Sequence, residues 1–384
     1  MNIVVKPEIV SGLRRNKPIP IEAIAKKLEI SVDEYNDIEK HGKELDQNTA
    51  QKLAGMYGRN WTVFLLNEAP AKPNYDEDHR TITNQKTGLG YKTYEALEEA
   101  DYLIDFVVNI SDEGENKIPV FTTKLSPKEM AASFRKATGL SVKKQPDFKS
   151  TGEAIKYWIA KLSSLDINVA SYQLGEDDGI RALSLYRKSK GMIVLNTDET
   201  DNGKIFSLMH ELCHILLRNT GVCDLNRSTV ESYCNQFASE MLIPTSLFEE
   251  LVEKYEVSAE NADETAIKIA RRLRVSRLAV LTRLLNAKVI SPKLYDTLSA
   301  EEYKKFNSLR QAKKTRQERN KASSKPAMIN PYVVNKARIG NLFLGELFNA
   351  YHSGKITPFE AGKYLGFKPD KISKFNEWAT SNGG

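Results

Sequence analysis

Amphipathic helices are predicted for most of the chain. From Pro20 to about Leu66, apolar residues recur every three or four positions, and Ser31 and Gly42 are suited to begin and end one of the helices. Further helices are predicted at 91–110, 126–139, 152–165 and 204–217, from 228 onward, in a pair around 271–286 and from 339 onward. Three short runs have the composition of strands instead, at 167–170, 183–186 and 191–196. We therefore expect a mainly α fold with a small β-sheet (α+β), in which the sheet leads directly into the helix at 204–217.

The composition narrows the class of protein. The chain has 384 residues, of which 41% are hydrophobic and 28% charged, and this length predicts two or three domains. No apolar run approaches the roughly 18–20 residues that a membrane-spanning helix needs. The cysteines, Cys213, Cys223 and Cys234, form no C-x-x-C pair, which argues against a disulfide scaffold or a zinc ribbon. We therefore expect a cytoplasmic protein that does not enter a membrane.

The patterns divide the chain into six segments. They are an N-terminal domain (1–70), a connecting helical segment (71–125), a core with the strands (126–256), a helical hairpin covering that core (257–303), a basic linker (304–326) and a C-terminal helical segment (327–384). Residues 304–325 hold nine Lys or Arg residues and one Glu, more positive charge than the net +6 of the whole chain. Such a run can bind nucleic acid, but the Ala-Ser-Ser-Lys-Pro sequence at its end favours a solvated linker.

The segment 1–70 resembles a small Cro/Xre-type helix-turn-helix domain. The run Ile38-Glu39-Lys40-His41-Gly42 matches the end of the recognition helix in such domains. This helix carries four acidic residues between Asp33 and Glu39, and the whole segment holds ten basic and ten acidic residues. Because a helix that enters a DNA groove lies beside phosphates, an acidic helix disfavours DNA binding. We expect the fold to be kept, with protein docking at least as well supported as specific DNA binding.

A candidate metal site lies in the helix predicted at 204–217. The sequence His210-Glu211-Leu212-Cys213-His214 has apolar residues on both sides and contains no Gly or Pro. Positions 210 and 214 are about 40° apart around a helix, so both imidazoles leave the same face one turn apart, as a tetrahedral zinc site requires. Glu211 points beside this face, where it can hold a water molecule and remove its proton. The alternative is a pair of core histidines satisfied by hydrogen bonds.

The next helix offers two carboxylates as a third ligand. Glu231 and Glu240 are nine residues apart, which places them about half a turn out of phase. Glu231 falls within the apolar arc of this helix and Glu240 opposite it, toward solvent. Asn235, one turn after Glu231, is placed to form a hydrogen bond with a ligand histidine. The sequence predicts Glu231 as the ligand, although Ser228 and Glu231 also fit a capping box.

Together these motifs resemble the ImmA/IrrE-type zinc metallopeptidases, long form. The resemblance rests on the strand 192–196, the run 210–214 and the helix 231–244, and it extends from 78–81 and the Xre-like N-terminus to residues 354–357. It implies a gluzincin-like core that holds one zinc ion per chain with His210, His214 and Glu231, and Glu211 as the general base. Similar proteins cleave or inactivate a helix-turn-helix repressor. Cys213 and Cys234 stand where such proteins usually have Gly or Ala, which leaves sensitivity to oxidation open.

Two classes of function follow. The first is a zinc-dependent endopeptidase that regulates gene expression by cleaving a helix-turn-helix repressor, with the substrate backbone aligned along the strand that ends near Asn196. The second is a transcriptional regulator or antitoxin-type binding protein, whose metal site serves structure or sensing. Tyr186 and Arg181 are weaker candidates for stabilising an oxyanion, and Tyr233 is expected on the outer side of its helix.

Overall fold

The fold is mainly α with a small β-sheet, as the sequence predicts, and it divides into two compact units. The computed structural model describes residues 2–17, 19–70, 90–111, 115–141, 148–175, 180–217, 227–301 and 330–381, with single residues at 304, 308, 312 and 315. The basic run at 304–325 and the stretch 78–81 therefore lie almost wholly outside the described residues. One unit comprises residues 1–99 with 173–180, and the other comprises 100–172 with 181–384. Among the described residues, no helix is both long and apolar enough to cross a membrane.

The first unit is a small helical body with its own core. Its elements are β1 (Asn2–Val5), α1 (Pro7–Asn16), α2 (Ile21–Leu28), α3 (Val32–His41), β2 (Lys43–Asp46), α4 (Gln47–Met56) and η1 (Trp61–Leu65). Ser31 and Glu34 form a reciprocal capping box at the start of α3, and Gly42 ends the helix at a φ of 73°. The antiparallel pairing of β1 with β2 was not predicted, because each strand is only four residues long and β1 starts the chain.

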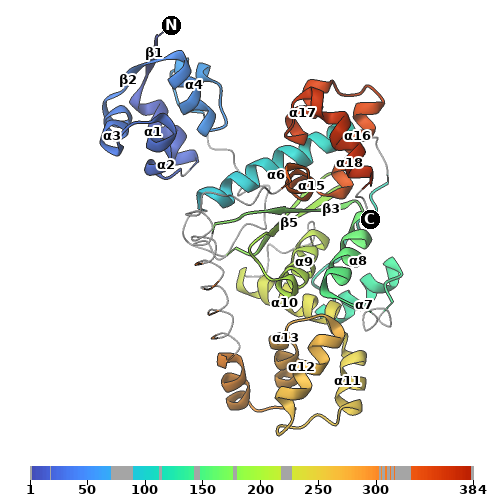
Figure 1. Ribbon diagram of the computed structural model, residues 1–384. Coiled ribbons are helices and arrows are strands. Elements are labelled where there is room, and N and C mark those ends of the chain that lie inside the picture. The colour runs from blue at the N-terminus through green and yellow to red at the C-terminus, as the bar shows by residue number, and fades with distance from the viewer. Residues whose placement is uncertain are drawn as a thin grey trace. The chain divides into compact units, whose positions relative to one another are not determined.

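The second unit is built around a three-stranded sheet (Figure 1). Its strands are β3 (Ile167–Tyr172), β4 (Ala182–Arg187) and β5 (Lys190–Asn196), in the spatial order β3-β5-β4. The central strand β5 runs parallel to β3 and antiparallel to β4. It is paired along nearly its whole length on both sides, so a substrate backbone cannot pair with it. The expectation that a substrate aligns along the strand ending at Asn196 is therefore wrong, because strand order is a tertiary property that the sequence pattern does not carry.

The remaining elements of the second unit are helices. They are α6 (Tyr91–Ile110, which begins in the first unit), α7 (Pro127–Thr138), α8 (Thr151–Ser163), α9 (Asp201–Leu216), α10 (Arg227–Leu242), α11 (Thr245–Lys254), α12 (Ala262–Leu273), α13 (Arg277–Asn286), α15 (Pro331–Ile339), α16 (Asn341–His352), α17 (Pro358–Leu365), η4 (Pro369–Lys371) and α18 (Ile372–Ser381). Helices α8 and α9 pack on one face, and α15 and α16 lie against β3 on the other (Figure 1). This places α9 directly beside the sheet, as expected.

The C-terminal helices are joined to the sheet by specific polar contacts. The fully buried amide of Asn168 on β3 donates to the carbonyl of Ile339 over 2.7 Å and accepts from the backbone N–H of Phe343. Lys190 on β5 forms an ion pair with Glu346 of α16 at 3.4 Å. A buried amide with both ends bonded fixes orientation as well as adding stability. Residues 330–381 thus belong to the same body as the strands.

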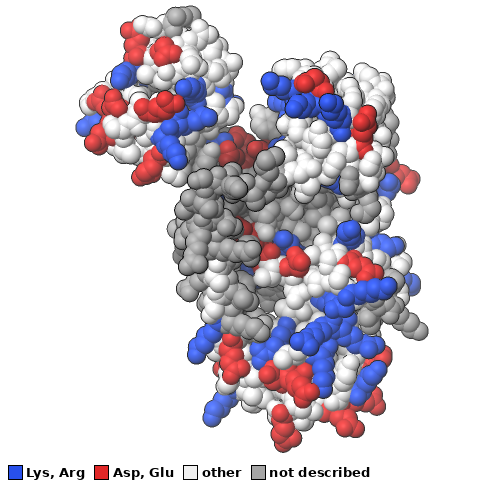
Figure 2. All heavy atoms as spheres, viewed as in Figure 1, with Lys and Arg blue, Asp and Glu red and all other residues white. Residues whose placement is uncertain are grey.

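The helix pair α12–α13 shares the hydrophobic core of the second unit. On the face shown in Figure 2, Lys and Arg gather over the region of these helices, and Lys268, Arg271 and Arg272 are exposed. Arg274, in the turn, instead donates to the carbonyls of Phe148 and Lys149. Helix α13 lies largely within the second unit.

Candidate metal centre

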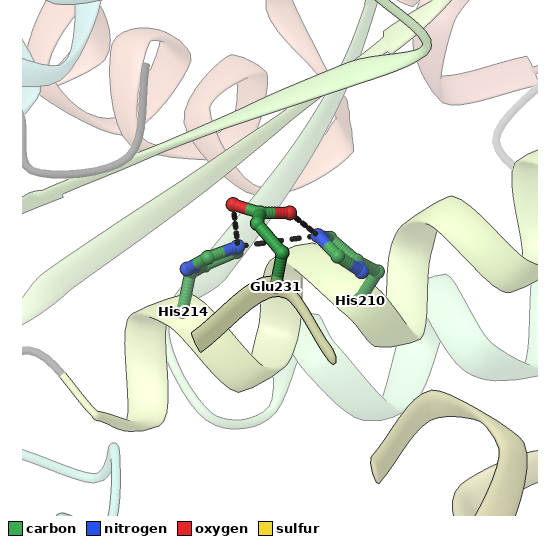
Figure 3. A group of neighbouring side chains, drawn as sticks. All are labelled: His210, His214 and Glu231. Carbon is green, nitrogen blue, oxygen red and sulfur yellow. Dashed lines mark hydrogen bonds and ion pairs between the residues drawn. The ribbon is translucent and has the colours of Figure 1, made fainter. Parts of the chain in front are cut away.

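Helix α9 presents both histidines of the candidate site on one face. Thr200 caps the helix by accepting from the N–H of Gly203, and nine residues of α9 are buried. His210 and His214 stand one turn apart, and their Nε2 atoms are 3.2 Å from each other (Figure 3). Their side chains are 15% and 9% exposed, so one edge of the pair stays accessible.

Helix α10 brings Glu231 to the same point (Figure 3). Its Oε2 lies 3.2 Å from Nε2 of His210, and its Oε1 lies 3.6 Å from Nε2 of His214. Among the described residues, these three form the one group of His, Cys, Asp or Glu side chains with ligand atoms close enough for a metal ion. Helix α10 begins at Arg227, so Glu231 is its fifth residue, too far along for the capping-box role.

The spacing of these atoms fits a tetrahedral zinc site. Zinc–nitrogen and zinc–oxygen bonds of about 2.0–2.1 Å place neighbouring ligand atoms of a tetrahedron about 3.3 Å apart. The two Nε2 atoms are 3.2 Å apart, and the nearest carboxylate oxygens of Glu231 lie 3.2 Å (Oε2) from His210 and 3.6 Å (Oε1) from His214, which is close to this value. Two imidazoles and one carboxylate are also the ligand types that zinc takes in hydrolytic sites, where a fourth position stays open. The residues present therefore fit the ion.

Asn235 orients one of the histidines. Its Oδ1 lies 3.0 Å from Nδ1 of His210, one turn along α10 from Glu231. An amide oxygen accepts here, so Nδ1 carries a proton and Nε2 is the ring nitrogen that faces Glu231 and is available to a metal ion. The structure places Asn235 in the position that the helical spacing predicts for this contact.

Glu211 lies deeper than the three candidate ligands. Its side chain packs in the interior beside the sheet, and the hydroxyl of Ser184 on β4 donates to its Oε2 over 2.6 Å. Burial raises the pKa of Glu211, while His210 and the Ser184 hydrogen bond act in the opposite direction. A carboxylate with a raised pKa is better suited to accept a proton from water near neutral pH. The sequence analysis did not single out Ser184, although a lone Ser in the apolar run Ala182–Tyr186 was a signal.

The two histidines differ in their affinity for protons. Burial and the neighbouring positive charge of His210 lower the pKa of His214 to about 4. Burial also acts to lower the pKa of His210, but the hydrogen bond with Glu231 and the charges of Glu211 and Glu231 outweigh it and raise the pKa. His214 is therefore neutral at physiological pH, the form that binds a metal.

Glu240 lies away from this group, but its environment differs from the prediction. It is buried rather than turned toward solvent, because Arg283 of α13 donates to its Oε1 over 2.6 Å. The N–H and the hydroxyl of Thr245 donate to the same carboxylate. Glu240 thus joins α10, α11 and α13. The positions of the two glutamates along α10 correctly place them on different faces of the helix. These positions do not reveal that α13 covers the face of Glu240.

The other candidates have structural partners. Tyr186 accepts from the amide of Asn116, and Arg181 pairs with Glu199 at 3.5 Å. Tyr233 is half-buried, and its hydroxyl donates to the carbonyl of Leu125, so the expected outer position is wrong because α7 packs against that side of α10. None of these contacts includes a candidate metal ligand.

Cys213 and Cys234 are free thiols in the buried interface between α9 and α10. The hydrogen bond with Cys213, together with burial, raises the pKa of the Cys234 thiol. Because the thiolate is the reactive form, this environment argues against an easily oxidised Cys234. Cys223 lies outside the described residues.

A comparison with protein families agrees with this geometry. Residues 163–285 match the family model Peptidase_M78, described as the IrrE N-terminal-like domain. The matched segment is less than half of the chain. It begins at the end of α8 and stops one residue before the end of α13, so it includes His210, Glu211, His214 and Glu231. It supports the ImmA/IrrE family and a metallopeptidase-type function for this segment. A search of curated proteins finds no match.

Proposed function

We propose that the chain is a zinc-dependent endopeptidase. One zinc ion would be held by His210, His214 and Glu231, and Glu211 would be the general base. The observation that carries the proposal is the group of two imidazole nitrogens 3.2 Å apart with one carboxylate that reaches both, through Oε2 at 3.2 Å and Oε1 at 3.6 Å, within the segment that matches a peptidase family. Two core histidines that were satisfied by hydrogen bonds alone would not need a carboxylate within reach of both rings.

The side chains around this group of ligands support hydrolysis. A bound zinc ion would polarise a peptide carbonyl and make a water molecule acidic enough to attack at neutral pH. Glu211 would accept the proton of the attacking water and deliver it to the departing amine. Asn235 would keep the Nε2 lone pair of His210 directed at the ion. Burial of the site strengthens each of these electrostatic interactions.

The proposed substrate is a helix-turn-helix repressor, and the proposed setting is regulation of gene expression in the cytoplasm. The resemblance to ImmA/IrrE-type proteins supports this substrate. The odd count of three cysteines, which argues against a disulfide scaffold, supports a reducing compartment. The alternative, a regulator or antitoxin-type protein with a structural or sensory metal, is supported by the order of short helices α1–α4 in the first unit.

The variant Glu211→Gln separates these functions. It keeps the size of the side chain but cannot take up a proton, and residue 211 is not a proposed ligand. The chain and its variants would be co-expressed with a helix-turn-helix repressor encoded beside it, and mass spectrometry would identify cleavage fragments. We expect Glu211→Gln to stay folded and retain zinc, with cleavage reduced by about two to four orders of magnitude, the usual contribution of a positioned base.

The control is the double variant His210→Ala/His214→Ala, which should lose both zinc and cleavage. If Glu211→Gln instead leaves the regulatory phenotype intact while the histidine variant abolishes it, the metal serves structure or sensing and the endopeptidase proposal is wrong.

A further inference from the structure

Strand β4 carries one buried hydroxyl next to the candidate site. Ser184 is 1% exposed and stands between Leu183 and Leu185 in an apolar strand, paired in register with Ile193 of β5. A buried hydroxyl destabilises a fold unless it forms a hydrogen bond. Serine also has a lower preference for a β-strand than β-branched residues have. The presence of Ser184 therefore calls for a specific partner.

That partner is Glu211. The Oγ–Oε2 distance of 2.6 Å lies in the range of about 2.5–2.7 Å expected for a hydroxyl that donates to a carboxylate. In the part of the chain that the structure describes, Ser184 is the one hydrogen-bond donor to this carboxylate. Oε1 of Glu211 receives no hydrogen bond from those residues, so one oxygen is fixed and the other is left for a ligand.

We propose that Ser184 is a positioning residue, which fixes the carboxylate of Glu211 through Oε2 so that Oε1 is held ready to take a proton. This inference rests on the proposed endopeptidase function. A glutamate side chain has three rotatable bonds, and the hydrogen bond from Ser184 selects one orientation of its carboxylate among those that it can reach. Without the Ser184 hydroxyl the carboxylate would sample several orientations, and only some would place Oε1 where the proton is transferred. A misplacement of about 1 Å can reduce a rate by about 100-fold.

The experiment is a double-mutant cycle with the zinc-loaded full chain. The variants are Ser184→Ala, Glu211→Gln and both together, assayed for kcat and KM on the cleaved repressor. We expect Ser184→Ala to lower kcat by about 10- to 100-fold, with KM and zinc content nearly unchanged. In the Glu211→Gln background, Ser184→Ala should have no further effect on kcat, because the serine acts through the glutamate.

Two further variants separate positioning from packing. Ser207→Ala removes another buried hydroxyl, from α9 itself, and should leave kcat unchanged. Ser184→Thr keeps the hydroxyl and should recover most of the kcat that Ser184→Ala loses. The proposal is overturned in favour of a packing role if Ser184→Ala lowers kcat equally in the wild type and in the Glu211→Gln variant. It is also overturned if Ser184→Ala and Ser207→Ala lower kcat equally.

A readout that does not depend on activity covers failure of the proposed function. If the wild type and Glu211→Gln show the same lack of cleavage, the endopeptidase function is at fault rather than the serine. The crystal structure of Ser184→Ala then decides the positioning role. The carboxylate of Glu211 should shift or occupy more than one orientation, and an unchanged, single orientation would overturn the proposal.

Discussion

The two glutamates of α10 allow one residue type on one helix to be tested for two different roles. Glu231→Ala removes the carboxylate that reaches both histidines, whereas Glu240→Ala removes the carboxylate that Arg283 binds. We expect Glu231→Ala to lose zinc with little loss of stability in the metal-free protein. We expect Glu240→Ala to retain zinc while the protein remains folded, but to unfold at a lower temperature.

The size of the second effect follows from the burial of the pair. The side chains of Arg283 and Glu240 are 13% and 11% exposed, and Nε of Arg283 is buried without a hydrogen-bond partner among the described residues. Removing one member of a buried ion pair leaves the other charge uncompensated and destabilises a protein by about 3–5 kcal/mol. At about 2–4 °C per kcal/mol for a domain of 150–250 residues, Tm should fall by roughly 6–20 °C.

Thermal unfolding of metal-free protein and elemental analysis of zinc-loaded protein measure the two effects separately. Glu240→Gln is the matched control, because an amide can still accept from Thr245 and Arg283, so its Tm should fall less than that of Glu240→Ala. If folded Glu240→Ala loses zinc, or if Glu231→Ala keeps a full equivalent, the assignment of the two carboxylates is reversed and the reasoning is refuted.

Three other predictions concern the site and the first unit. Asn235→Ala should weaken zinc binding by about 10- to 100-fold, as measured by competition with a chelator, because His210 loses the contact that fixes its ring; an unchanged affinity would contradict this role. As the pH is lowered below the raised pKa of His210, zinc affinity should fall about tenfold per pH unit, because one proton competes with zinc for His210. His214, with a pKa of about 4, takes up a proton only near that pH, so a slope of two protons at pH 6 would contradict this prediction. Residues 1–70 should bind duplex DNA weakly and without sequence preference in an anisotropy titration, since their charges balance and α3 is acidic; about nanomolar affinity for one operator would favour the regulator function instead.

Local periodicity was sufficient to predict the elements that carry the site. The helices predicted at 91–110 and 126–139 correspond to α6 and α7, and all three predicted strands are present within a residue or two. The spacing of four residues between His210 and His214 fixes their relative direction on any α-helix, whatever surrounds it. The helical phase of α10 likewise places Glu231 rather than Glu240 beside the two histidines. Helices α9 and α10 bury their apolar faces against each other, and the histidines and Glu231 project from those faces.

Long-range packing explains what the sequence did not reveal. The partner of Glu240 is Arg283, on a helix that follows 43 residues later, and no property of α10 alone indicates that its second face is covered. Ser184 and Glu211 are separated by 27 residues and meet only because β4 lies next to α9. The same holds for Asn168, whose partners on the C-terminal helices lie more than 170 residues away.

The spacing of the site depends on small residues where α9 and α10 meet. A glutamate side chain has a fixed reach, so Glu231 contacts both imidazoles only if the two helices approach closely. Cys213 and Cys234 are completely buried at this interface, and their thiols are in hydrogen-bond contact with each other. Cysteine behaves here as a small apolar residue. A larger side chain at either position would have to separate the helices, and the carboxylate would then move away from the histidines. The two cysteines therefore contribute to the geometry of the candidate zinc site through their volume rather than through their chemistry.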